Sequence, residues 1–274
     1  MNMRILPGRA SGTVVAPPSK SVAHRALIAA ALCGGTSVIS NVGDSEDIAA
    51  TLSALQVLGA QIERHDGQVT VTGCDPKSHL GGKVDCNESG STLRFLIPLF
   101  ALGNETAVFT GKGRLLARPQ DVYAELFKTQ GLPFCASTEG IALQGPLMAG
   151  DYALRGDVSS QFVTGLLFAL PLCAGASVLR IAEPFESRSY VKLTLEVLGR
   201  FGIRAAWIDK NTLKIFGNQR YQPTDLRVEG DYSGAAFFGL LGALSGAVDC
   251  RGLCIPSAQG DAVFFELLRC FGAR

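Results

Sequence analysis

The stretches Gly12-Thr13-Val14-Val15, Gly82-Lys83-Val84-Asp85 and Tyr152-Ala153-Leu154-Arg155 begin at residues 12, 82 and 152, and so recur every 70 residues. Ser19, Ser89 and Ser159 follow them at the same step, as do short apolar stretches that begin at residues 36, 106, 176 and 246. Self-similarity of this kind indicates stacked copies of one supersecondary unit. The stretch at 246 belongs to a fourth copy that lacks its final strands, so we expect part of the molecule to be missing.

Each copy is predicted to contain a strand, a helix, a strand, a helix and then two strands. In the first copy, strands are expected over 13–16 and 38–39, and a hairpin over 61–72 turns at Asp66-Gly67. Its helices are expected to run from Ser19 to residue 32 and from Asp44 to residue 58. Further helices are predicted over 89–102, 119–129, 159–172, 187–200, 232–244 and 257–270, and strand pairs over 133–143 and 204–215.

The composition is that of a globular protein, with 47% apolar and 18% charged residues in 274. A net charge of +1 argues against a general polyanion-binding surface, so no nucleic-acid partner is expected. The apolar stretch 162–174 is broken by Gly165 and Pro171, and it predicts a buried helix rather than a membrane span. Met1 leads into strand-like Arg4-Ile5-Leu6 without a signal or transit segment, so a cytoplasmic protein is expected.

The eight cysteines contain no Cys-x-x-Cys pair, and the three histidines are scattered along the chain. Zinc sites in proteins need closely spaced ligands of these types. We therefore expect no metal, and we predict that the cysteines are small core residues in a reducing compartment.

Four predicted helices begin at equivalent places with a small polar residue, at Ser19, Ser89, Ser159 and Asp231. Helix N-termini carry unpaired N–H groups and partial positive charge, so a cluster of such ends can bind an anion. Ordinary capping explains any one of these residues equally well. The residues next to these helix starts therefore distinguish an anion-binding site from capping alone.

Basic and hydroxyl side chains lie next to these helix starts. Lys20 and Arg25 flank Ser21 in the first helix, and Arg25 falls in an otherwise apolar stretch, where a basic residue needs a partner. Asp44 or Asp47 could supply that partner as a salt bridge. Arg118 precedes another predicted helix, and Ser159-Ser160-Gln161 offers two hydroxyls and an amide. Together these groups suit a small molecule that carries phosphate and carboxylate.

The motifs around these residues resemble those of the 3-phosphoshikimate 1-carboxyvinyltransferase family, also called 5-enolpyruvylshikimate-3-phosphate (EPSP) synthase. Pro17-Pro18-Ser19-Lys20-Ser21-x-x-x-Arg25 is similar to its N-terminal signature, and Asn87-x-Ser89-Gly90-Ser91-Thr92-x-Arg94 to its second. Arg118-Pro119, Val158-Ser159-Ser160-Gln161-Phe162 and Ser187-Arg188-x-Tyr190 resemble further site segments. Gln259-Gly260-Asp261 resembles a segment of the family's other domain.

The resemblance implies the enolpyruvyl transferase fold, of the α/β (α+β) class, in which repeated β-α-β-α-β-β units form an inside-out α/β barrel domain. Residues 16–228 would form one complete three-repeat substrate-binding domain. Residues 1–15 and 229–274 would belong to a second, truncated domain. A monomer is implied for the full-length protein.

The implied reaction transfers the carboxyvinyl group of phosphoenolpyruvate to the 5-hydroxyl of shikimate 3-phosphate and releases phosphate, without a cofactor. By resemblance, Lys20 would contact both substrates, Gln161 would bridge them, and Gly90 and Arg118 would hold phosphoenolpyruvate. Arg94 would brace the turn at Gly90. The residues implied for shikimate 3-phosphate are Ser21, Arg25, Ser159, Ser160 and Ser187, with Tyr190 against its ring. The catalytic acid and base would lie beyond Arg274, so this chain is expected to bind substrate without turning it over.

Two enzyme families of related architecture match less well. UDP-N-acetylglucosamine carboxyvinyltransferases would have a reactive cysteine within 111–118, where this chain has none, and they lack the Lys20-Ser21-x-x-x-Arg25 motif. RNA 3′-phosphate cyclases would use a nucleophilic histidine, whereas His24 is expected to cap or pack near Lys20. A ligand-binding module without catalysis, built from the family's first half, stays an alternative.

Overall fold

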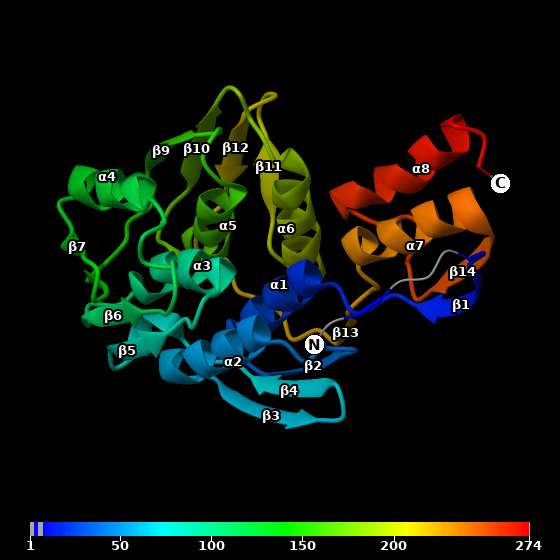
Figure 1. The fold of residues 1–274 in the computed structure, drawn as a ribbon. Coiled ribbons are helices and arrows are strands. Elements are labelled where there is room, and N and C mark those ends of the chain that lie inside the picture. Colours follow the sequence, from blue (N-terminus) through cyan, green and yellow to red (C-terminus); the bar gives the residue numbers. More distant parts are fainter. Residues whose placement is uncertain (1–2, 5–7, 274) are drawn as a thin grey trace.

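The structure is a computed structural model that describes residues 3–4 and 8–273 of the chain (Figure 1). The strand predicted at 4–6 lies outside the described residues apart from Arg4. No helix in the described ranges is both long and apolar enough to cross a bilayer. The stretch 162–174 instead forms α5 (Ser160–Ala169) and a 3-10 turn (Leu170–Leu172), and most of it is buried, as predicted.

Three four-stranded sheets share one topology, which confirms the predicted repeat. In each sheet two parallel strands are followed by an antiparallel hairpin. The first sheet, in spatial order, consists of β13 (Leu226–Arg227), β2 (Thr36–Ser40), β4 (Gln68–Thr72) and β3 (Gln61–His65). The second consists of β5 (Gly82–Asp85), β6 (Ala107–Thr110), β8 (Ile141–Leu143) and β7 (Phe134–Ala136). The third consists of β9 (Asp151–Arg155), β10 (Ser177–Ala182), β12 (Thr212–Ile215) and β11 (Ala205–Trp207).

The strand predicted at 13–16 exists but does not start the first sheet. It forms β1 (Ser11–Val15), which pairs in parallel with β14 (Ala247–Arg251) in a separate two-stranded sheet. Its place beside β2 is taken by β13, which pairs through Leu226 and Ile39. A two-residue strand carries no periodicity, so the sequence does not predict β13.

Helices occupy the middle of the three-sheet body. α1 (Lys20–Ala31), α3 (Gly90–Phe100) and α5 are buried on almost every side, because their sequences are apolar around the whole circumference. α2 (Glu46–Leu58), α4 (Asp121–Thr129) and α6 (Arg188–Arg200) bury one face each. Figure 1 shows α7 (Tyr232–Ser245) and α8 (Val263–Cys270) beside β1 and β14, apart from the three larger sheets.

Several predicted boundaries are wrong by a few residues. Asp44 does not cap α2, because it pairs with Arg64; the cap is Ser45, whose hydroxyl accepts a bond from the N–H of Ile48 at 3.3 Å. α4 begins at Asp121, two residues after Pro119. The helix predicted over 257–270 is a 3-10 turn (Gly260–Ala262) followed by α8.

The cysteines divide between the core and the surface. Cys33, Cys86 and Cys173 are buried, as predicted for small core residues. Burial raises the pKa of the Cys33 thiol to about 11, which keeps it protonated and unreactive. The prediction is wrong for Cys135, Cys254 and Cys270, which are exposed.

Candidate anion-binding site

The first turn of α1 presents Lys20 beside a carboxylate. Lys20 Nζ lies 2.5 Å from Asp47 Oδ2, and the lysine side chain is 56% exposed. The salt bridge expected between Arg25 and Asp44 or Asp47 is therefore wrong, because each aspartate pairs with another cation. An exposed pair of this kind contributes little to stability, so Lys20 can turn toward a ligand at small cost.

Arg25 is buried without a carboxylate partner. The residue is 3% exposed, and none of the ion pairs among the described residues involves it. Its guanidinium donates to Thr194 Oγ1 at 2.8 Å, to the carbonyl of Ser21 at 2.7 Å and to that of Tyr190 at 3.3 Å. It also lies 5.1 Å from the ring centroid of Phe95. Desolvation lowers the pKa of Arg25 to about 10, so it stays charged at neutral pH.

A second group of predicted residues gathers where α3 begins. A Cβ atom on Gly90 would lie 2.7 Å from Arg118 Nη1, so the guanidinium packs against bare backbone. Gln161 Nε2 donates to Ser91 Oγ at 3.1 Å, and Gln161 Oε1 accepts from Arg94 Nη1 at 2.9 Å. Arg94 was expected to brace the turn at Gly90. It instead holds Gln161 and, at 3.0 Å, the carbonyl of the residue that follows Arg118.

Buried hydroxyl groups connect the helices that carry these two groups. His24 Nδ1 lies 2.8 Å from Thr51 Oγ1, which lies 2.7 Å from Thr92 Oγ1, so α1, α2 and α3 are joined. Thr164 and Thr194 join α5 to α6 at 3.0 Å. His24 packs in the core, one of the two roles expected for it, and desolvation lowers its pKa to about 3. A neutral histidine buried there does not serve as an exposed nucleophile.

The three equivalent serines behave differently. Ser89 Oγ accepts from the N–H of Thr92 at 3.1 Å, and Ser159 Oγ accepts from that of Gln161 at 3.3 Å, so both cap their helices. Asp231 caps α7 in the same way. Ser19 does not cap α1; its hydroxyl donates to Gln259 Oε1 at 3.1 Å.

The structure thus brings the predicted residues together in two groups. Contacts join Ser21, Arg25 and Tyr190 on α1 and α6, and Gly90, Arg118 and Gln161 around α3 and α5. Lys20 precedes Ser21 in α1 and pairs with Asp47. Ser159 and Ser160 adjoin Gln161 at the start of α5. Ser187 is exposed before α6, and its side chain has no hydrogen bond within the described part of the chain.

Sequence reasoning assigned no contact to Thr194, Ser91 or Gln259, and it did not predict that Asp47 pairs with Lys20. Thr194 lies four residues after Tyr190, and so on the same face of α6, which is the one signal that could have found it. Its contact with Arg25 spans 169 residues of sequence. No local pattern predicts a contact of that range.

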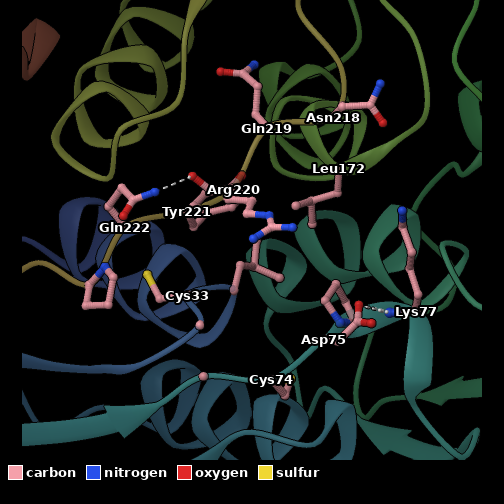
Figure 2. Close-up of a pocket in the computed structure, with 15 residues that line it drawn as sticks. Cys33, Cys74, Asp75, Lys77, Leu172, Asn218, Gln219, Arg220, Tyr221 and Gln222 are labelled. Carbon is pink, nitrogen blue, oxygen red and sulfur yellow. Dashed lines mark hydrogen bonds between the residues drawn. The ribbon is translucent and has the colours of Figure 1, made fainter.

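A separate hollow of about 890 Å³ lies at the other ends of the buried helices (Figure 2). Figure 2 shows the Arg220 side chain reaching into it, with Cys33 after α1 on one side and Lys77 on the other. None of the predicted site residues lines this hollow. Helix C-termini carry partial negative charge, so the site is assigned from the N-terminal ends and not from the size of the cavity.

Residues 6–274 match the family model described as EPSP synthase (3-phosphoshikimate 1-carboxyvinyltransferase). The chain belongs to the EPSP synthase family. Two similar relatives, both named 3-phosphoshikimate 1-carboxyvinyltransferase, come from Clostridium kluyveri (46% identical over 98% of the chain) and Clostridium botulinum (43% over 97%). The chain spans 63% of the length of each.

A similar solved structure is the EPSP synthase of Acinetobacter baumannii. It matches with a TM-score of 0.77 and 25% identity, over 92% of this chain and 58% of that one. The resemblance drawn from the motifs is therefore confirmed, and so is the mixed α/β enolpyruvyl transferase fold. The roles of individual residues stay predictions.

Proposed function

We propose that this chain carries the substrate-binding residues of a shikimate-pathway transferase. The reaction moves the carboxyvinyl group of phosphoenolpyruvate to the 5-hydroxyl of shikimate 3-phosphate and releases phosphate. One observation carries the proposal: Arg25 is a buried guanidinium that pairs with no carboxylate among the residues that the structure describes. Burying an unpaired cation costs several kcal/mol, roughly, and an anionic ligand offsets that cost.

Shikimate 3-phosphate binds where α1 and α6 meet and at the start of α5. Ser21 and Arg25 lie on the first of these surfaces, and Ser159 and Ser160 on the second. Tyr190 is 39% exposed and its ring centroid lies 5.9 Å from the Arg25 guanidinium, so one side chain can cover both the ligand ring and the arginine. Ser187 closes over the same ligand from the loop before α6.

Phosphoenolpyruvate binds at the second group. Gly90 lets the Arg118 guanidinium pack against bare backbone, and this exposed guanidinium has no ion-pair partner in the described ranges. A planar guanidinium binds carboxylate or phosphate through two parallel hydrogen bonds. Gln161 lies between α3 and α5 and bridges the two substrates, and Lys20 contacts both. The residues need no metal or cofactor.

The chain is organised as two domains, 16–228 and 1–15 together with 229–274. The proposal is supported by β13, which completes the first sheet near residue 228, and by β1, which pairs with β14 across the remainder. The full-length enzyme works in the cytoplasm as a monomer.

Chemistry needs an acid and a base. Asp47, beside the first group, is paired with Lys20. Asp231 and Asp261 line a small pocket with Ser21 and Tyr190, but Asp231 caps α7 and Asp261 accepts from Ser233. We therefore expect the 274-residue polypeptide to bind shikimate 3-phosphate without turning it over. A phosphate-release assay on that polypeptide checks this. Turnover at a rate typical of an enzyme would contradict it and favour catalysis by residues already present.

Binding is tested by calorimetric titration of shikimate 3-phosphate into the wild-type chain and into Arg25→Met. We expect the wild type to bind and the variant to lose about 50-fold or more in affinity, because a charge-assisted contact to phosphate contributes about 1.5–3 kcal/mol and the pocket loses its net charge. Arg180→Met is the matched control, since Arg180 pairs with Asp151 on an exposed strand. Equal affinity for wild type and Arg25→Met would refute the proposal.

A further inference from the structure

Ser19 differs from its two equivalents in a way that points to another residue. All three serines precede a buried helix, yet Ser19 directs its hydroxyl away from α1 and toward Gln259. Both residues are buried, Ser19 fully and Gln259 to 8% exposure. The two lie 240 residues apart in sequence, so the contact joins separate parts of the fold.

The Gln259 side chain holds two segments, one at Ser19 and one at residues 230–232. Its Oε1 accepts from Ser19 Oγ at 3.1 Å and from the N–H of Tyr232 at 3.1 Å, and its Nε2 donates to the carbonyl of Gly230 at 2.9 Å. Its own N–H donates to Ser257 Oγ at 3.1 Å. The starts of α1 and α7 are therefore fixed relative to one amide group.

The backbone on either side of Ser19 is held by the same region. The N–H of Ser19 donates to the carbonyl of Glu229 at 2.8 Å, and the N–H of Asp231 donates to that of Pro17 at 2.7 Å. Lys20 and Ser21 follow directly. The contacts that hold Ser19 therefore also set the positions of Lys20 and Ser21, the first two residues of α1.

We propose that Gln259 is a positioning residue for the anion-binding site, acting through Ser19 on Lys20 and Ser21. This inference rests on the proposed function. Gln259 keeps the Ser19 hydroxyl from capping its own helix, as Ser89 and Ser159 do. Without Gln259 the hydroxyl turns to the N–H of Val22, the third residue of α1, and the first turn changes its geometry at the ligand.

The test compares variants that differ in one hydroxyl or one amide. Ser19→Thr and Ser19→Val have the same shape, and only the first can donate to Gln259. We expect Ser19→Val and Gln259→Leu each to weaken shikimate 3-phosphate binding by about tenfold, a loss in the range expected for one buried hydrogen bond. Ser19→Thr keeps the hydroxyl, so its affinity should stay within about threefold of wild type. The double variant Ser19→Val with Gln259→Leu should be no weaker than Gln259→Leu alone, because the contact that Ser19→Val removes is already lost there.

Ser257→Ala is the matched control. It removes bonds to Glu229 and to the Gln259 N–H in the same segment without touching α1, and it should leave affinity unchanged. Hydrogen exchange adds a readout that needs no ligand: the Val22 amide should become protected in Gln259→Leu, where Ser19 is released to cap it.

The outcomes separate the two proposals. If the wild type does not bind shikimate 3-phosphate, the proposed function fails and this inference fails with it. If the wild type binds, and neither Ser19→Val nor Gln259→Leu changes affinity, the inference alone is overturned. A loss in Ser257→Ala equal to that in Gln259→Leu would also overturn it, since general loosening of the segment would then explain the effect.

Discussion

Arg25 shows how far a single residue can be interpreted from sequence. A basic residue inside an apolar stretch predicts a partner, and that prediction is right in kind and wrong in identity. The partners are a hydroxyl and two carbonyls, of which the Thr194 hydroxyl lies 169 residues away. Because hydrogen bonds of this type do not neutralise the charge, the residue is explained by a ligand better than by stability.

Gly90 gives a prediction about binding without a change in folding. In Gly90→Ala the new methyl group would lie 2.7 Å from Arg118 Nη1, so the guanidinium has to move, and it can, because it is the exposed end of a flexible side chain. We expect phosphoenolpyruvate affinity, measured by calorimetry with shikimate 3-phosphate present, to fall about tenfold, since a displaced arginine loses a charge-assisted contact. The free energy of unfolding should change by less than about 1 kcal/mol.

The control for this substitution is Gly199→Ala. Gly199 lies in α6, and a Cβ atom there meets no atom within 4 Å. Alanine is the better helix former, so this variant should gain up to about 1 kcal/mol of stability and keep its affinity. Unchanged affinity in Gly90→Ala would show that Arg118 is not held against the glycine.

His24 makes the stability of the fold depend on pH. Burial lowers its pKa from 6.5 to about 3 in the folded chain, so below pH 6.5 the unfolded state binds a proton that the folded state does not. Stability from this group is therefore complete above pH 6.5 and is lost as pH falls toward 3. The slope approaches about 1.4 kcal/mol per pH unit inside that window.

Urea unfolding at several pH values between 4 and 7 measures this slope. In His24→Asn the slope should become shallower, because the titrating group is gone. His65→Asn is the matched control, since His65 is exposed and pairs only with its neighbour Asp66. A slope that is the same in wild type and His24→Asn would contradict the buried, neutral state of the ring.

At the scale of elements, the sequence predicts whether a segment is a helix or a strand better than it predicts where that segment begins and ends. The buried helices were found because α1, α3 and α5 are apolar all round, and the hairpin of β3 and β4 because Asp66-Gly67 specifies its turn. Asp44 is the predicted start of α2 because Asp47 follows it three residues later, the spacing of a capping box. Ser45 caps the helix in its place because the Asp44 carboxylate forms an ion pair with Arg64 of β3.

Pairs of helices in the core depend on hydroxyl contacts that sequence does not predict. Thr92 Oγ1 lies 2.7 Å from both Thr51 Oγ1 and Ser89 Oγ, so one side chain joins α2 to the start of α3. Thr92→Val keeps the shape and removes both bonds, so the buried hydroxyls of Thr51 and Ser89 each lose one partner. We expect a loss of about 1–3 kcal/mol in the free energy of unfolding. Thr129→Val, at an exposed hydroxyl bonded to a carbonyl in α4, should cost less than about 0.5 kcal/mol, and equal losses would argue against the contact.

At the scale of the whole molecule, the repeat predicts three like sheets, and the structure has them. It does not predict which strand completes the first sheet, because β13 and its partner β2 are separated in sequence by the other two sheets. The motifs named residues that the structure gathers in two groups at the starts of buried helices, since equivalent helix starts in a repeat are brought to one side. They did not predict the contacts of Gln259, which join Ser19 near the start of the sequence to Tyr232 far along it.

α7 and α8 present an apolar surface to solvent. α7 has no charged residue, yet only Tyr232 and Ala235 are buried in it. Phe237 is 77% exposed, Leu244 78% and Phe271 88%, so α7, α8 and the residue that follows α8 present large apolar side chains to solvent. Exposed apolar surface of this extent drives association. We expect the 274-residue polypeptide to self-associate reversibly, with a weight-average mass that rises with concentration in sedimentation velocity experiments.

A charge in the middle of this surface should oppose that association. In Leu244→Glu the carboxylate would have to be desolvated in the contact, which costs more than the leucine gains, so the variant should stay monomeric at concentrations where the wild type does not. Leu80→Glu is the matched control, because Leu80 is 93% exposed but lies on a loop far along the chain from α7 and α8. The two variants replace the same residue type and add the same charge, so a difference between them depends on position alone. If only Leu244→Glu stays monomeric, the α7–α8 surface holds the copies together. If both variants associate as the wild type does, another surface holds them.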